Sequence, residues 1–390
     1  MRLVAHLSWA YLRHRPGPTL LLAAALGLVL WLPIASRLVV QRFEAQLMSR
    51  AEATPLVAGA PGSRFDLVLS SLYFRGRAAD PIDAAHWDAL AEAPEDVLCI
   101  PIHRLHTLRE APLVGTTPEY QERRGLRIAA GEEALFLGEV ALGAKLAERL
   151  DLGPGATVFS DPPELYDLAQ PPSIELTVTG VYAPTGTPDD EAAFTGLQTC
   201  WMVDGLVHGH VDAETGLPPE LVLGGNETET VVSPAMSSVQ KVTPENLASF
   251  HTHGEREDLP LSSVLLFPAS DKDRTLLRTR VAAKGPGKVA TPTEVVGELL
   301  GFAVRLQRLI DVLALLIGAG TATLAGLVLA LSARLRAAEL RTLDRMGATR
   351  TLGTQLLSAH AGVAVLGAIL LAGALLLPLL WILDDPTRWL

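Results

Sequence analysis

Two pairs of histidines have the spacing that could hold a metal ion. His208 and His210 lie in the segment VHGHVD, and His251 and His253 lie in FHTHGERED. Residues i and i+2 of a strand face the same side, so each pair could offer two imidazoles to one ion. Zinc sites use three or four such ligands, and the sequence does not show that the pairs meet. The alternative is that these are exposed loop histidines, so no metal ligand is assigned.

The other candidate side chains are two cysteines and two further histidines. The chain has two cysteines, Cys99 and Cys200, and a disulfide between them is allowed if their compartment is oxidising. The alternative is a pair of buried free thiols. His103 and His106 follow a short apolar run and are predicted to be surface or interface residues. We expect no catalytic set and no cofactor in this chain.

Three apolar segments are near or above the length that a helix needs to cross a bilayer. They cover residues 19–35, 309–331 and 356–383. The first could instead be a signal peptide, but its apolar core is longer than usual and no clear cleavage site follows, so a retained helix is favoured. These segments predict a membrane protein whose largest soluble part lies between the first and second crossings.

Charge sets the expected orientation. The first eighteen residues contain three arginines and no acid, and residues 334–350 contain five arginines against Glu339 and Asp344. Short arginine-rich flanks stay in the cytoplasm, so the large domain is expected outside. The formal net charge of −11 argues against nucleic acid as a partner.

The expected order of parts follows from these segments. It is a cytoplasmic amphipathic helix (1–18), a first membrane helix (19–37), an extracytoplasmic domain (38–300), a stalk with the second membrane helix (301–333), a basic cytoplasmic segment (334–352), a third membrane helix (353–383) and an outer tail (384–390). Arg308 and Asp311, near the outer end of the second membrane helix, could pair or could reach the interface separately.

The sequence of the outer domain predicts an α+β fold. Strand, helix and strand are expected at 65–72, 81–93 and 97–102, and again at 263–267, 271–281 and 288–290. These two βαβ-like units would form a base from residues 54–110 and 260–291. A β-rich insert (111–259) would contain a helix at 139–150 and a strand at 174–182. The fold class is thus an α-helical membrane protein with three membrane helices and a large α+β extracytoplasmic domain.

The basic segment RLRAAELRTLDRMGATR (334–350) contains a motif of spaced Arg, Glu and Leu residues followed by Gly-Ala-Thr. It resembles the cytoplasmic segment R-x-x-E-x-x-x-L-x-x-x-G-A-T/S of MacB/FtsX-type permeases, the type VII ABC transporters that include macrolide exporters and lipoprotein-release complexes. The matching residues are Arg336, Glu339, Leu343, Gly347, Ala348 and Thr349. Three outer segments, 56–74, 138–158 and 176–190, are also similar to the outer domains of such permeases.

The resemblance implies a coupling helix that seats in a cleft of a cytoplasmic ABC ATPase. Its expected contact residues are Arg336, Glu339, Leu340, Leu343, Met346 and Gly347. The chain has no G-x-x-x-x-G-K-[ST] phosphate loop, so ATP and Mg²⁺ would be held by that separate ATPase. From composition alone, the same segment could be a surface helix whose arginines touch anionic lipid.

The resemblance also implies a dimer with a second permease chain, in the inner (cytoplasmic) membrane, handling lipoprotein, lipid, peptide or drug cargo. A periplasmic or outer partner is allowed. The family usually has four membrane helices, so a three-helix variant, a helix missing from this sequence or a helix from another chain is expected. Two other functions remain open: a membrane-anchored sensor or binding protein, with or without metal, and an FtsX-like regulator of an outer hydrolase.

Overall fold

The computed structural model describes residue 13 and residues 16–92, 96–161, 173–209, 222–225, 230–232, 241–244, 246–252, 255–284, 287–335, 341–342, 345 and 351–384. The chain separates into two compact units. One unit contains residues 1–46 and 298–390, and the other contains residues 47–297. The expected amphipathic helix (1–18) and outer tail (384–390) lie almost entirely outside the described residues.

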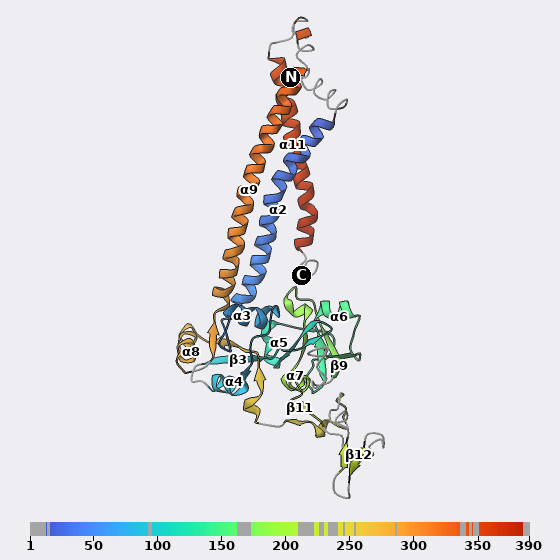
Figure 1. Ribbon diagram of the computed structural model, residues 1–390, viewed down its shortest axis with the longest axis vertical. Coiled ribbons are helices and arrows are strands. Elements are labelled where there is room, and N and C mark those ends of the chain that lie inside the picture. Colours follow the sequence, from blue (N-terminus) through green and yellow to red (C-terminus); the bar gives the residue numbers. More distant parts are fainter. Residues whose placement is uncertain are drawn as a thin grey trace. The chain divides into compact units, whose positions relative to one another are not determined.

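The first unit is built from three helices that are long and apolar enough to cross a membrane. They are α2 (Gly17–Glu52), α9 (Pro292–Leu335) and α11 (Leu352–Asp384), and they run side by side in Figure 1. Small residues allow close approach: a Cβ added at Gly27 would lie 3.0 Å from Leu371, and one at Gly367 would lie 3.1 Å from Ala23. Both contacts join α2 to α11.

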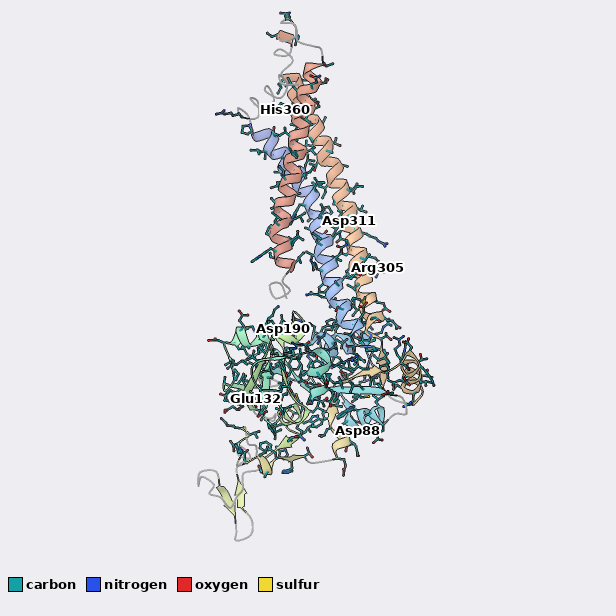
Figure 2. All side chains as sticks on the ribbon, turned by 180° about the vertical axis from the view of Figure 1, so that it is seen from behind. Asp88, Glu132, Asp190, Arg305, Asp311 and His360 are labelled. Carbon is teal, nitrogen blue, oxygen red and sulfur yellow. The ribbon has the colours of Figure 1, made fainter. Side chains whose placement is uncertain are left out.

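A polar contact joins α2 to α9. Arg37 donates to Asp311 at 2.7 Å, and Gln307 donates to Ser36 at 3.1 Å and to Asp311 at 3.2 Å. Asp311 lies on α9 six residues beyond Arg305 (Figure 2). The sequence suggested Arg308 as the neighbour that could pair with Asp311, and the ion pair instead reaches a residue 274 positions away on another helix. Spacing along one helix could not reveal that partner.

The second unit has a base sheet with the strand order β17-β1-β16-β3. Its strands are β1 (Leu56–Gly59), β3 (Val97–Ile102), β16 (Ser263–Pro268) and β17 (Lys288–Ala290). Every neighbouring pair is antiparallel, so β1 is parallel to β3 with β16 between them, and β16 is parallel to β17 with β1 between them. These are two interleaved split βαβ units. The predicted α+β base from both ends of the domain is confirmed.

Helices α3 (Arg64–Tyr73), α4 (Ala84–Ala91) and α8 (Asp271–Lys284) connect these strands. The strand predicted at 65–72 is wrong, because this segment is α3. The Ser63 side chain accepts from the Asp66 N–H at 3.2 Å and caps the helix. Phe65, Val68, Leu69 and Leu72 follow the helical i, i+3, i+4, i+7 spacing, which outweighs their β-like composition.

A seven-stranded sheet forms the insert. Its strand order is β4-β5-β10-β7-β9-β6, with β8 on β9, and it mixes parallel and antiparallel pairs. The strands are β4 (Thr107–Leu108), β5 (Ala111–Thr116), β6 (Ile128–Gly131), β7 (Glu139–Leu142), β8 (Thr157–Phe159), β9 (Glu175–Tyr182) and β10 (Ala193–Gly196). The predicted β-rich insert is therefore confirmed.

Short helices pack on this sheet: α5 (Pro118–Arg124), α6 (Ala144–Leu150), α7 (Leu197–Val203) and the 3-10 turn η1 (Pro188–Glu191). The predicted helix at 139–150 is half correct, because its first residues form β7 and α6 begins only at Ala144, after the N-cap Gly143. A Cβ at Gly143 would lie 2.2 Å from the Asp189 carbonyl oxygen, so this turn requires glycine.

The remaining elements are small. They comprise β2 (Ile82–Asp83) with β15 (Pro260–Leu261), β11 (Val207–His208) with β14 (His251–Thr252), β12 (Val222–Gly225) with β13 (Thr230–Val232), and the turns η4 (Leu247–Ser249) and η5 (Arg256–Asp258). Base and insert share one hydrophobic core, in which Leu56 and Leu266 of the base join Leu113, Leu142 and Leu176 of the insert.

Candidate functional site: a buried arginine network at the end of helix α2

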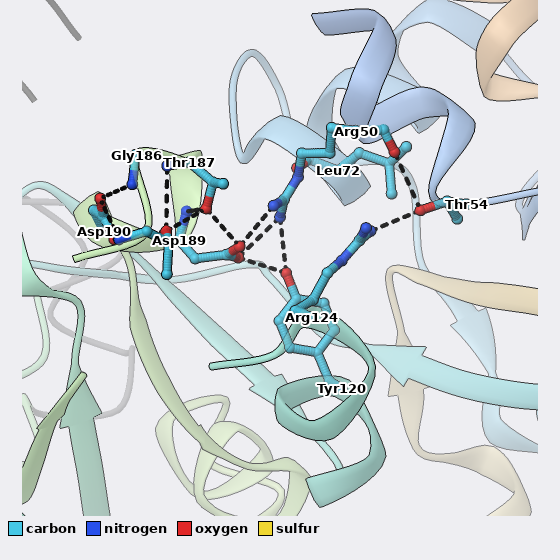
Figure 3. A network of polar contacts seen from close by, with 10 residues as sticks. Arg50, Thr54, Leu72, Tyr120, Arg124, Gly186, Thr187, Asp189 and Asp190 are labelled. Carbon is cyan, nitrogen blue, oxygen red and sulfur yellow. Dashed lines mark hydrogen bonds and ion pairs between the residues drawn. The ribbon is translucent and has the colours of Figure 1, made fainter. Parts of the chain in front are cut away.

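Arg50, in the last turn of α2, is the centre of a buried polar network (Figure 3). Its guanidinium donates to both carboxylate oxygens of Asp189, at 2.6 Å and 2.8 Å, and to the Tyr120 hydroxyl at 2.9 Å. Its Nε donates to the carbonyl oxygen of Leu72. Only 7% of Arg50 and 3% of Asp189 is exposed. One side chain thus connects the end of α2 with α3, α5 and η1.

A second arginine strengthens this junction. Arg124 of α5 donates to the Thr54 hydroxyl at 2.7 Å, and that hydroxyl donates to the Arg50 carbonyl oxygen at 3.5 Å. The Tyr120 hydroxyl donates to Asp189 at 2.7 Å. The segment that follows α2 is therefore held by side chains of the insert as well as by its own backbone.

The carboxylate of Asp189 must stay ionised for this arrangement. Burial alone would raise its pKa, but the charge of Arg50 and the hydrogen bonds from Arg50 and Tyr120 outweigh burial and hold the pKa at about 2. Burial also raises the pKa of Tyr73 to about 12, so this phenol is neutral and donates to the Leu47 carbonyl oxygen. The network is a fixed ion pair rather than a proton-transfer site.

Local structure positions Asp189 and Asp190 of η1. Thr187 caps this turn by accepting from the Asp189 N–H at 3.3 Å, and its hydroxyl donates to the Asp189 carboxylate at 2.9 Å. Asp190 accepts from the N–H groups of Thr185 and Gly186 at 2.9 Å and 2.8 Å. The bonds from Asp190 hold the loop before η1, so Asp189 is presented to Arg50 in one orientation.

Aromatic rings surround the ion pair. Phe194 contacts Phe74, Tyr120 and Tyr182 at ring-centroid distances of 6.1, 5.6 and 5.7 Å. The Arg50 guanidinium lies 5.6 Å from the centre of the Phe74 ring. Water is therefore excluded from the ion pair, and in such surroundings removal of one partner is far more costly than at the surface.

A second polar cluster lies where β3 leads into the insert. Asp204, just after α7, accepts from His103 Nε2 at 2.7 Å and from His106 Nε2. His103 is fully buried, and its backbone exchanges two hydrogen bonds of 2.8 Å with Gly115 of β5. Burial alone would raise the pKa of Asp204, but the two histidine hydrogen bonds hold it at about 2.

The expectation that His103 is a surface or interface residue is therefore wrong, whereas the side chain of His106 is 12% exposed. Both histidines follow strand β3, and both are held by the Asp204 carboxylate. Asp204 lies about a hundred positions away, so no local spacing links it to them.

The two cysteines are free thiols, so the disulfide allowed by the sequence is absent. Cys99 is half-buried on β3, and Cys200 is buried on α7. Burial raises the pKa of Cys99 to about 11 and raises that of Cys200 as well. Both thiols are protonated at neutral pH, which makes them poor nucleophiles.

The residues expected to contact an ATPase lie outside the described residues. They are Arg336, Glu339, Leu340, Leu343, Met346 and Gly347. Arg341 and Arg345 between them have helical backbone. Of the four histidines with metal-ligand spacing, His208 and His251 are described and face one another across β11 and β14, and His210 and His253 are not described.

Acid should weaken this domain through Asp189. An unfolded aspartate titrates near pH 4, and the folded group titrates at about 2. The pair therefore contributes stability above about pH 4 that is lost as pH falls toward about 2, with Asp204 acting in the same direction. We expect the thermal transition of the full chain in detergent to fall across that window. The transition temperature of the Asp189→Asn variant should fall less over the same pH range. An equal fall for the two proteins would contradict the assignment of this pH dependence to Asp189.

No family model matches the chain, and no curated protein matches it. Among solved structures, the periplasmic region of MacB from Actinobacillus actinomycetemcomitans is similar at 11% identity and a TM-score of 0.34, covering 65% of this chain and 97% of that one. The extracellular domain of the noncanonical ABC-type transporter YknZ from Gram-positive bacteria is similar at 11% identity and a TM-score of 0.32, covering 60% and 98%.

At this identity and TM-score, no residue role passes from those proteins to this one. The roles proposed below come from the contacts and sequence of this chain.

Proposed function

We propose that this chain is the permease subunit of a MacB/FtsX-type ABC transporter in the cytoplasmic membrane, crossing it several times with the large domain outside. The chain itself is non-catalytic. ATP hydrolysis by a separate cytoplasmic ATPase would move the outer domain, which handles lipoprotein, lipid, peptide or drug cargo. The permease would work as a dimer with a second permease chain.

The Arg50 network is the observation that carries this proposal. Helix α2 extends without a break from Gly17 to Glu52, and its last turn is fixed by Arg50 to α3, α5 and η1. A helix that ends in a flexible linker could move without its domain, whereas a helix end held by a buried ion pair cannot. This is the property that a transmitting element needs.

Helix α9 supports the same conclusion from the other end of the domain. It begins at Pro292, two residues after β17, and continues to Leu335. Its first turns belong to the unit of residues 47–297 and its remainder to the helical unit. Tilting of α9 would therefore act on the base sheet through β17 without an intervening loop.

The coupling segment provides the test of this proposal. Replacing Leu343 and Met346 together by aspartate should remove the apolar stripe that would seat in the ATPase, because two carboxylates would have to be buried unpaired. We expect the amount of ATPase that co-purifies with the tagged chain from its native host to fall at least tenfold. The control is Leu135→Asp, at a position that is 60% exposed in the insert and should change nothing.

Two outcomes would count against the proposal. The first is unchanged ATPase recovery with the double variant. The second is an equal loss with Leu135→Asp, which would indicate a general defect in folding or membrane insertion rather than a lost contact.

A further inference from the structure

The short ribbon of β11 and β14 brings two histidines into direct opposition. His208 pairs with His251 in the antiparallel register, next to the pair Val207 and Thr252. The ring centroids of the two histidines are 5.4 Å apart, and the planes are inclined by 56°. Directly opposed positions of antiparallel strands are the closest cross-strand neighbours, so the two rings share one face of the ribbon.

That separation suits a shared metal ion. Zinc binds imidazole nitrogen at about 2.0–2.1 Å in tetrahedral geometry, which places the centroids of two ligand rings on the order of 5 Å apart. The rings of His208 and His251 therefore lie at a separation that two ligands of one ion can have. His251 is exposed and His208 is partly exposed, so an ion can enter from solvent.

Hydrogen bonds set the tautomer of both rings. Nδ1 of His251 lies 2.9 Å from the Ser249 carbonyl oxygen, and Nδ1 of His208 lies 3.4 Å from that of Gly205. A carbonyl oxygen only accepts, so each Nδ1 carries the proton and each Nε2 carries the lone pair. A backbone carbonyl that accepts from the second ring nitrogen is the usual support for a metal-binding histidine.

We propose that His208 and His251 bind one divalent transition-metal ion, such as Zn²⁺, through their Nε2 atoms. Among the described residues, no group of three His, Cys, Asp or Glu side chains surrounds such an ion. Water would complete its coordination in a site built from these two ligands. The ion would fasten β11 to β14, whose pairing spans only two residues of each strand.

The proposal does not depend on ATP-driven transport, and its test is separate. The full chain in detergent, carrying no polyhistidine tag, is titrated with Zn²⁺ by calorimetry and with Co²⁺ by visible absorption. We expect one ion per chain, and at least a tenfold weaker affinity for both His208→Gln and His251→Gln.

His360→Gln is the matched control. Nδ1 of His360 also contacts a backbone carbonyl oxygen, that of Leu356 at 2.7 Å, but His360 lies on α11 in the other unit. Its replacement should leave the affinity unchanged. Circular dichroism of each variant excludes loss through unfolding, and His251 is exposed enough for its replacement to leave the fold intact.

Three results would overturn the proposal. One is no uptake of either ion by the unaltered chain. Another is unchanged affinity in His208→Gln or His251→Gln. The third is a site that survives both of these changes and is lost in His210→Gln or His253→Gln, since the ion would then be held by other histidines.

Discussion

Replacing Asp189 by asparagine should lower the free energy of unfolding of the outer domain by about 3–5 kcal/mol, because it leaves the buried charge of Arg50 without its partner. The loss is expected to be large since Arg124 adds a second positive charge beside the same pair. Thermal or urea unfolding of the full chain in detergent, followed by tryptophan fluorescence, to which Trp87 and Trp201 of this domain contribute, measures the change.

A neighbouring ion pair provides the control. Arg75 donates to Glu191 at 2.7 Å, the same distance range as the buried pair, but the Arg75 side chain is 64% exposed. Glu191→Gln should therefore cost less than about 1 kcal/mol. Equal effects of the two changes would contradict the claim that burial makes the Arg50 pair decisive.

A double-mutant cycle separates the pair from the packing around it. If Arg50→Met is combined with Asp189→Asn, the cost should be well below the sum of the single changes, because the second change removes the charge that the first left unpaired. Additive costs would mean that Arg50 acts through its contacts with Leu72 and Phe74 rather than through Asp189.

Breaking α9 at Gly301 should abolish transmission without removing the ATPase. Proline at position 301 would clash with the carbonyl of Gly297 and remove one helical hydrogen bond, at a cost of about 3 kcal/mol. The resulting kink lies between β17 and the apolar part of α9. We expect the ATPase to co-purify in normal amount, while the outer domain no longer responds to ATP.

A fluorescent label reports that response. The label is attached at Leu135→Cys, since this position is 60% exposed while Cys99 and Cys200 are protonated and at least half-buried. The Leu135→Cys chain with its ATPase should show an ATP-dependent fluorescence change, and the same chain carrying Gly301→Pro should show none.

Gly301→Ala is the matched control for the proline variant. A Cβ at position 301 meets nothing within 4 Å, and alanine favours the helix by about 1 kcal/mol over glycine. The alanine variant should therefore respond at least as well as the unaltered chain. A full response from Gly301→Pro would show that continuity of α9 is not needed.

Features of the fold that produce a recognisable pattern within a short stretch of residues could be predicted from the sequence. The apolar segments predicted the three long helices, and the strands β3, β9, β16 and β17 lie where alternating or β-rich runs placed them. The sequence predicted two βαβ-like units at the ends of the domain, but it missed β1 and did not indicate that the strands of the two units interleave. The helix α3 was missed because its composition favours a strand while its spacing favours a helix.

Almost no pattern in the sequence around its residues indicated the candidate site, because the partners are far apart along the chain. Arg50 and Asp189 are separated by 139 positions, and Asp204 and His103 by 101. An arginine at a helix end is ordinary, and only tertiary packing makes this one buried. One signal was available: the sequence TGTPDDE, in which Thr187 and Pro188 begin a turn before two adjacent acids that the core then buries.

Mild-detergent purification of the tagged chain from its native host, read by mass spectrometry, shows whether an ATPase binds this chain. We expect to recover a stoichiometric ABC ATPase carrying a phosphate loop, which this chain lacks. Any lipoprotein or second permease recovered with it would narrow the cargo and the assembly. Recovery of the chain alone, or with only an outer binding partner, would contradict the transporter proposal and favour an anchored sensor or binding protein.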